Sequence, residues 1–346
     1  MDESLERKLY VKPYDRMVSD VVDEILNNNI ILDPDYQRNY VWTNKKASLL
    51  IESILLNIPI PVIYASEDTN GKWIIVDGLQ RLFSLKRFFS DEFKLYGLET
   101  LSMFNGKKFS NLDVAVQTKI RRGELRFIVL QNDSDPNIQF DIFMRLNTGA
   151  VALNQQELRN CLYRGTLNDM VKEFVLNNEC AKVMIRKNPT RMFGNELVLR
   201  YLAISNSFDK KTQEIKNYDG RLKNIINCYM KSNQNVVGEE LLAIKTKIQT
   251  SFEKAFRVYG EKAFLTNDFS TKINASLAEC ILIAFEDYDI SVLEDKKNEL
   301  NKGRLELLSD PDFIKYIDKA TGNTESINKR VKKFSDMVKS RVENDF

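Results

Sequence analysis

The chain has 346 residues, of which 51 are Lys or Arg and 49 are Asp or Glu. That length suits about two domains, and the balanced charge gives no overall attraction to nucleic acid or to membranes. The sequence contains no histidine. This absence excludes a Ser-His-Asp triad, a Cys-His pair, an HEXXH zinc site and an HNH nuclease centre within the chain. Any catalysis must use other residue types, with Mg²⁺ as the expected cofactor for phosphate chemistry.

The first residues are charged and lack the apolar core of a signal peptide, and no apolar run is long enough to span a bilayer. We therefore expect a cytoplasmic protein that does not enter a membrane. The cysteines lie far apart, without a Cys-x-x-Cys pair, and are expected to be reduced and packed. They are Cys161, Cys180, Cys228 and Cys280.

In chain order, the first predicted element is an amphipathic helix over residues 17–28. The stretch 33–42 contains a proline and paired aspartates, which disfavour a helix, so an extended edge segment followed by a turn is predicted there. A second helix over residues 45–56, capped by Thr43 or Asn44, stops at an Ile-Pro-Ile-Pro run.

A predicted hairpin then leads directly to Asp77. Its strands cover residues 61–65 and 72–76, and an Asp-Thr-Asn-Gly turn joins them. An amphipathic helical pattern begins after Gly78, so this stretch is a strand, a turn and a helix. No GxGxxG or GxxxxGK[ST] motif occurs, which argues against Rossmann and P-loop sites.

This helix start carries Asp77, Gln80 and Arg81. Helix N-termini bind anions, above all phosphates, whereas a cation in the first turn opposes the helix dipole. An anion held between Arg81 and the helix start would remove that conflict. The alternative is that Asp77 is only an N-cap, Gly78 only a turn residue and Arg81 only solvated surface.

The elements up to residue 165 alternate between strands and helices. A strand is predicted at 93–96, a helix from the capping signal at 110–113 to Gly123, a strand at 124–130 and a helix from Asp135-Pro136. Asn154 and Glu157 have the spacing of a second capping signal.

After Gly165 almost every segment has helical periodicity. The predicted helices cover residues 166–176, 194–205, 219–230, 238–259, 270–285, 291–308 and 325–342. The last one carries a basic cluster that either contacts phosphate backbones or belongs to a solvated helix packed on its apolar face. The cluster consists of Lys329, Arg330, Lys332 and Lys333.

Several motifs together resemble one known family. The stretches Tyr36-Gln37-Arg38…Val41-Trp42 and Val76-Asp77-Gly78-Leu79-Gln80-Arg81 are similar to the N-terminal domain of GmrSD-type modification-dependent restriction enzymes. So are Leu50–Ile54 with Ile58–Pro61, and Phe143–Gly149 with Leu153–Leu158. The resemblance covers about residues 15–165, with its motifs in the expected order.

The resemblance implies an α+β fold. A small ParB/sulfiredoxin-like mixed-sheet module is expected over residues 1–165, followed by a larger all-α helical domain over residues 166–346. It also implies nucleotide binding and hydrolysis in a restriction-type, anti-phage defence system that acts on or senses DNA.

Carried over by position, the motifs assign roles to individual residues. Nucleoside triphosphate binding falls to Gln37, Arg38, Gly78, Arg81 and Asn147. Asp77, Gln80 and Arg81 are the expected catalytic residues, and Asp77 the expected Mg²⁺ ligand. Physically, Arg38 and Arg81 could clamp phosphate oxygens, and Gly78 would let the backbone approach them.

The chain departs from the family pattern in two ways. Leu79 stands where the signature Asp-Gly-Gln-Gln-Arg has its first Gln, which bears on hydrolysis. An HNH nuclease unit is missing, so a separate nuclease subunit is an expected partner, and a homo-oligomer is also compatible with the sequence.

The sequence leaves two other functions open. One is a Mg²⁺-dependent ParB-like DNA nuclease, for which Glu92-Phe93-Lys94 offers a carboxylate and a lysine. The other is a non-catalytic DNA-binding regulator that uses the arginine-rich cleft and the basic cluster of the last helix.

Overall fold

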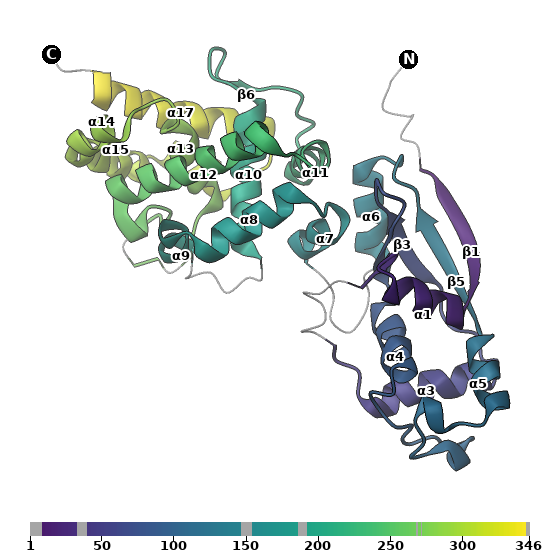
Figure 1. Cartoon of the computed structure of the whole chain (residues 1–346). Helices are drawn as coiled ribbons and strands as arrows, with labels where there is room; N and C mark the ends of the chain where they lie inside the picture. The colour runs from purple at the N-terminus through teal and green to yellow at the C-terminus, as the bar shows by residue number, and fades with distance from the viewer. Residues whose placement is uncertain are drawn as a thin grey trace, which may run out of the picture. The chain divides into compact units, whose positions relative to one another are not determined.

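The computed structural model describes residues 9–32, 40–146, 154–185, 192–267, 269–270 and 272–343. The chain divides into two compact units, Met1–Leu162 and Tyr163–Phe346. Figure 1 labels most of the helices and several of the strands.

The N-terminal unit is built on a mixed five-stranded sheet with the strand order β1-β5-β3-β4-β2. β1 pairs antiparallel with β5 and β3 antiparallel with β4, whereas β3–β5 and β2–β4 are parallel. This mixed sheet, followed by a helical second unit, confirms the predicted α+β class. The strands are β1 (Val11–Met17), β2 (Ile30–Ile31), β3 (Ile63–Glu67), β4 (Trp73–Asp77) and β5 (Glu124–Leu130).

Local signals predicted the central hairpin correctly. In its turn, one carboxylate oxygen of Asp68 accepts hydrogen bonds from the backbone N–H groups of Asn70 and Lys72, both at 2.8 Å. Such an Asp side chain reproduces a backbone turn and fixes where the two strands meet. The register then carries β4 to its end at Asp77, which lies opposite Tyr64.

Strand β1 was not predicted. Nearly all its residues are exposed, and it contains Pro13, which normally argues against a strand. β1 lies at the edge of the sheet, where the inward backbone bonds are made at Tyr10 and Val18. Backbone groups of successive residues in a strand point alternately toward and away from the neighbouring strand, and Pro13 is an odd number of residues from both Tyr10 and Val18. Its missing N–H therefore lies on the outer side of the sheet, where a proline discourages pairing with another chain.

Helices α1, α3, α4 and α5 share one hydrophobic core with the sheet. That core contains Trp73 and Ile75 of β4, while Ile74 and Val76 are buried outside it and α6 and α7 contact the same strand. Because side chains alternate along a strand, helices cover both faces of β4. The helices are α1 (Val18–Leu26), α3 (Asn44–Leu55), α4 (Leu79–Phe89), α5 (Val114–Arg121), α6 (Pro136–Leu146) and α7 (Gln155–Leu162).

The strand predicted at residues 93–96 is wrong. Only Leu95 makes ladder-like backbone bonds, with Lys107 O at 2.9 Å and Gly106 N at 2.7 Å. The apolar residues that suggested a strand are buried in a loop instead, where Phe93 packs on Phe88 with ring centroids 5.3 Å apart.

In the described part of the second unit, the only strands are β6 (Phe208–Asp209) and β7 (Glu214–Ile215), two residues each, and the other regular elements are helices. The single helix predicted over 291–308 is wrong, because the backbone leaves the helical conformation at Lys296. No helix among the described residues is long and apolar enough to cross a bilayer. The helices are α8 (Thr166–Asn177), α9 (Glu179–Ile185), α10 (Phe193–Ser207), α11 (Leu222–Ser232), α12 (Gly238–Tyr259), α13 (Ala275–Ala284), α14 (Ile290–Asp295), α15 (Lys297–Ser309), α16 (Pro311–Asp318) and α17 (Thr324–Glu343).

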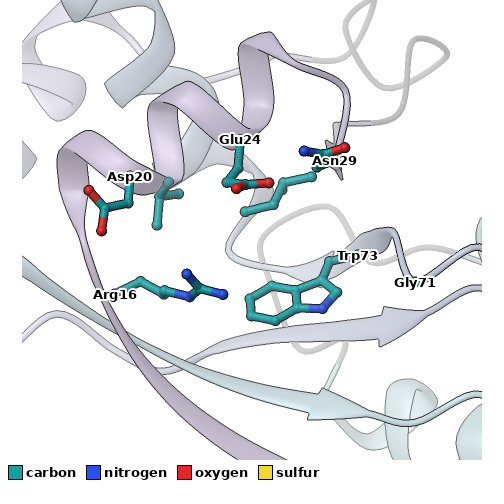
Figure 2. A pocket seen from close by; sticks show the side chains of 8 residues that line it. Arg16, Asp20, Glu24, Asn29, Gly71 and Trp73 are labelled. Carbon is teal, nitrogen blue, oxygen red and sulfur yellow. The ribbon is translucent and has the colours of Figure 1, made fainter.

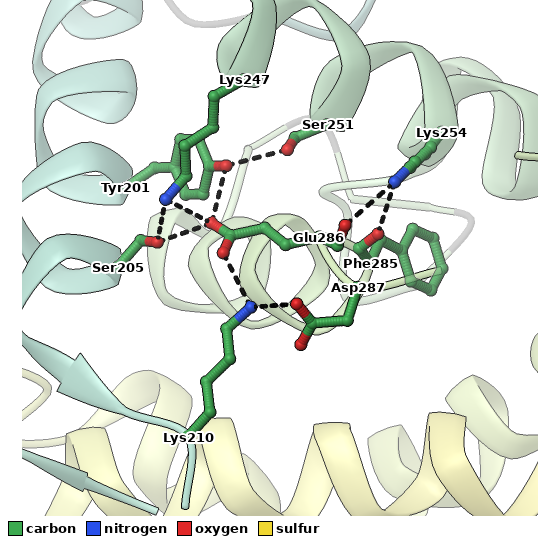
Figure 3. Close-up of polar contacts among 9 residues, drawn as sticks. All are labelled: Tyr201, Ser205, Lys210, Lys247, Ser251, Lys254, Phe285, Glu286 and Asp287. Carbon is green, nitrogen blue, oxygen red and sulfur yellow. Dashed lines mark hydrogen bonds and ion pairs between the residues drawn. The ribbon is translucent and has the colours of Figure 1, made fainter. Parts of the chain in front are cut away.

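A charged network around Glu286 ties several of these helices together (Figure 3). Its side chain is 12% exposed and accepts hydrogen bonds from Tyr201 at 2.8 Å and Ser205 at 2.6 Å. Lys247 and Lys210 lie 3.1 Å and 3.0 Å from its carboxylate oxygens. Burial alone would raise the pKa of Glu286, but these donors outweigh burial and hold the pKa below its ordinary value.

We expect Glu286→Gln to lower the free energy of unfolding by about 1–3 kcal/mol near neutral pH, because Lys247 loses its carboxylate partner, whereas Lys210 keeps Asp287 at 2.7 Å. A lowered folded-state pKa stabilises the fold above the ordinary value of 4.5, and that stabilisation is lost as the pH falls below it. Urea denaturation from neutral pH to below 4.5 measures the free energy of unfolding of the variant and of the wild type.

The difference in the free energy of unfolding between Glu286→Gln and the wild type should therefore become smaller at acid pH. Glu294→Gln is the matched control, because its ion pair with Arg257 is exposed and 3.9 Å long. The control should change stability by less than about 1 kcal/mol. A Glu286→Gln gap that stays constant down to acid pH would contradict this account.

Candidate functional site

The predicted site is the turn between β4 and α4. Strand β4 ends at Asp77, helix α4 begins at Leu79, and Gly78 joins them with φ 95°. A Cβ atom on Gly78 would lie 2.9 Å from Cγ1 of Ile63. The left-handed conformation and this close approach both require glycine.

The buried side chain of Arg81 stabilises this turn by hydrogen bonds to three residues. Its Nη2 lies 3.0 Å from Oδ2 of Asp77 and 3.3 Å from the carbonyl oxygen of Val62, and its Nη1 donates to the carbonyl of Pro61. The residue is 9% exposed, and burial lowers the pKa of its guanidinium while Asp77 opposes that shift. Arg81 is therefore neither solvated surface nor a freely mobile clamp.

The start of α4 is a helix N-terminus at which Gly78 and Arg81 are buried. No side chain of the described residues caps this helix, and the carboxylate of Asp77 binds Arg81 instead of acting as an N-cap. Asp77 also offsets the unfavourable charge of Arg81 in the first turn. The three bonds of Arg81 use three of its five N–H donors, which leaves two for another acceptor.

Gln80 binds protein backbone. Its Oε1 accepts hydrogen bonds from the N–H groups of Val41 at 3.2 Å and Trp42 at 3.3 Å. The side chain thereby anchors the end of the segment that carries the Tyr-Gln-Arg motif. The motif alone suggests that Gln80 orients a water or reads the nucleotide, whereas its contacts give it a positioning role.

Tyr40 is anchored on the same face of α4. Its hydroxyl lies 2.9 Å from Oγ of Ser84, its ring centroid is 5.2 Å from that of Phe83, and the guanidinium of Arg87 lies 4.9 Å above it. With Gln80, these residues are spaced i, i+3, i+4 and i+7, which is one helical face. Sequence reasoning missed this group, although that spacing was a readable signal.

The remaining predicted nucleotide-binding residues, Gln37, Arg38 and Asn147, lie outside the described residues. Described elements next to them contact the two elements that form the turn. Tyr40 binds α4, and both α6, which ends at Leu146, and α7 contact β4.

The capping signal between α6 and α7 is real. Asn154 N donates to Glu157 Oε2 and Glu157 N donates to Asn154 Oδ1, both at 2.9 Å. These reciprocal bonds form a capping box, which accounts for the two residues without a ligand.

Metal ligands are sparse near the turn. The described part of the chain contains no group of three or more Asp, Glu, Cys or His residues able to hold a metal ion. Asp77, the predicted Mg²⁺ ligand, is a single carboxylate bound on one side to Arg81. Glu92 of the alternative nuclease motif is paired with Arg87 at 3.2 Å.

The basic cluster of the last helix is divided between surface and interior. Arg330 is fully buried, with Nη2 at 2.6 Å from Oε2 of Glu279, so its expected contact with DNA is wrong. Lys333 is half-buried and bound to Asp310 at 2.5 Å. Only Lys329 and Lys332 are exposed.

Comparison with known families identifies the N-terminal unit. Residues 18–164 match the family described as GmrSD restriction endonuclease, N-terminal domain. The match begins with α1 and ends just after α7, so it contains the β4–α4 turn and leaves the helical unit outside. No curated protein and no solved structure matches the chain.

Replacing Gln80 should loosen the segment that it anchors. We expect Gln80→Ala to destabilise the protein by about 1–2 kcal/mol, because two backbone N–H groups lose their acceptor. Hydrogen exchange at the amides of Val41 and Trp42 should become faster. Gln80→Glu keeps the oxygen acceptor and should leave both amides protected from exchange. If Gln80→Ala protected them as well as the wild type does, this role of Gln80 would be refuted.

Proposed function

Because the N-terminal unit belongs to the GmrSD restriction endonuclease N-terminal domain family, we propose that this chain is a nucleotide-binding, NTP-hydrolysing component of a restriction-type defence system. The single observation that supports the nucleotide site is the β4–α4 turn. There an uncapped helix start, a glycine of positive φ and a buried arginine come together.

In this proposal the phosphates lie at the start of α4. Backbone N–H groups and the dipole of a helix N-terminus favour negative charge, whereas glycine at position 78 is required by its positive φ and by the nearby side chain of Ile63. The two remaining N–H donors of Arg81 supply charge-assisted hydrogen bonds. Arg81 needs no rearrangement for this, because its bonds to Pro61 and Val62 already fix its position.

Asp77 is the proposed ligand for Mg²⁺. Its side chain is 41% exposed, so one carboxylate oxygen remains for an ion although the other binds Arg81. A single carboxylate fits Mg²⁺ only together with substrate phosphates and water, which is how this ion is usually bound at nucleotide sites. When bound, the ion would neutralise charge on the phosphates.

Binding is better supported than hydrolysis. Leu79 packs against the N-terminal core at the position of the family's first Gln, and Gln80 is held by the backbone of residues 41–42. We therefore propose that the free oxygen of Asp77 acts on the attacking water through the Mg²⁺ ion that it would hold. Without histidine the chain would act with a separate nuclease subunit, and DNA is its proposed target.

A nucleotide that binds only the folded protein raises its melting temperature. We expect such a rise with at least one NTP and Mg²⁺, and its loss in Asp77→Asn. Arg81→Ala is a poor test, because it would also release the chain before β3. Asp113→Asn is the matched control, since Asp113 is exposed and caps no helix through its side chain. Thermal stability without ligand checks folding.

Absence of a shift with any NTP would overturn the proposed site. A shift of equal size in Asp77→Asn would remove Asp77 from it. Release of phosphate, measured with and without DNA, then separates hydrolysis from binding alone.

The proposed contact with DNA is restricted to Lys329 and Lys332. Replacing both by alanine should reduce the slope of log affinity against log salt by about two, since each phosphate contact contributes about one. Lys297→Ala with Lys302→Ala, on α15, is the control for net charge. Fluorescence anisotropy of a labelled duplex measures the slope, and an unchanged slope would exclude this face of α17.

A further inference from the structure

A small cavity lies in the N-terminal unit, away from the β4–α4 turn. It has a volume of about 120 Å³ and lies between the polar face of α1, the end of β1 and the edge formed by β2 and β4 (Figure 2). Drug-sized ligands occupy pockets of roughly 300–1,000 Å³, so this cavity suits only a small ligand or one part of a larger one.

One side of this cavity carries a cation next to aromatic rings. The guanidinium of Arg16 lies 5.5 Å from the ring centroid of Trp73 and 5.9 Å from that of Tyr14. Both distances are within the range of cation–π attraction, although Arg16 is an exposed residue. Figure 2 shows the guanidinium beside Trp73, on the side of the ring that faces α1.

The opposite wall supplies acceptors. Asp20 and Glu24 are one turn apart on α1, and Asn29 follows the helix. Within the described ranges, the side chains of Arg16, Glu24 and Asn29 have no hydrogen bond or ion pair, although cation and carboxylates line one cavity. A ligand between them must accept hydrogen bonds on one edge and donate on another.

We propose that this cavity binds a guanine base. O6 and N7 of guanine are adjacent acceptors that match the paired donors of Arg16. Its N1–H and 2-amino groups are adjacent donors that match the carboxylate of Glu24, which can only accept. A base placed between these two side chains would lie next to Trp73, which also lines the cavity.

Other bases fit this arrangement less well. Adenine presents the acceptor N1 beside its amino group, and that nitrogen would face the carboxylate without a hydrogen bond. Cytosine offers Glu24 one donor group, its 4-amino group, where guanine offers two. The expected order of affinity is therefore guanine, then cytosine, then adenine.

This inference goes beyond the nucleotide site proposed at the β4–α4 turn. Trp73 and Asp77 are at opposite ends of β4, about 13 Å apart at the rise of a strand. The two sites can therefore be tested independently with separate variants.

Isothermal titration calorimetry of the full chain with GMP tests the proposal. IMP lacks the 2-amino group and should bind about tenfold more weakly, because one hydrogen bond to a charged group is lost. Glu24→Gln should weaken GMP binding at least about tenfold and should reduce the preference for GMP over IMP. Asp23→Asn, exposed on the same helix, is the matched control and should bind GMP as the wild type does.

Three results would overturn the proposal: no binding of GMP, equal affinity for GMP and AMP, or unchanged binding in Glu24→Gln. Loss of GMP binding in Asp77→Asn but not in Glu24→Gln would place guanine at the β4–α4 turn, which refutes this cavity while supporting the nucleotide site there.

Competition between GMP and a single-stranded oligothymidylate that carries one central dG tells whether the cavity takes a free nucleotide or a base of DNA. Displacement of GMP supports a base in DNA, and no displacement supports a free nucleotide.

Discussion

The structure of the N-terminal unit depends on one buried guanidinium. Arg81 joins the end of β4, through Asp77, to the chain that enters β3, through the carbonyl groups of Pro61 and Val62. A buried cation is costly unless it is paired and hydrogen-bonded, and these three acceptors meet that need. The same bonds fix the position at which α4 begins, because Arg81 lies in its first turn.

Helix α4 links the position of this turn to two other parts of the N-terminal unit. One face carries Leu82, Leu85 and Phe88 into the core shared with the sheet. The face that begins with Gln80 anchors residues 40–42, which follow the Tyr-Gln-Arg motif. The turn, the core and the motif segment are therefore coupled through one helix, which explains why a site at its start can be rigid although its motifs are distant in sequence.

Sequence reasoning succeeded where the signal was local. The Asp68 turn, the Asn154–Glu157 capping box and strand β5 each follow from a few adjacent residues. It failed where a residue meets a distant partner. Strand β1 is exposed and contains a proline, and it becomes a strand only because β5 lies beside it.

The same limit applies to charged residues: Arg81 binds carbonyls some twenty residues away, and Arg330 binds Glu279, fifty-one residues away. Periodicity shows which face of a helix a residue occupies, but it does not show which other element covers that face. For Arg330 the covering element is α13, and its carboxylate makes burial of the cation possible.

Leu79 decides how far the motif supports chemistry as well as binding. Holding a phosphate requires backbone N–H groups and a positioned cation, and both depend on Gly78 and Arg81. Activating a water requires a positioned acceptor whose hydrogen bonds are not already satisfied. Leu79 has no polar atom in its side chain, and the Oε1 of Gln80 already accepts two hydrogen bonds from backbone. Among the described residues of this turn only Asp77 has a carboxylate, and Arg81 already binds one of its oxygens. Under the proposed function the turn would retain a nucleotide, and its hydrolysis would depend on the second oxygen of Asp77.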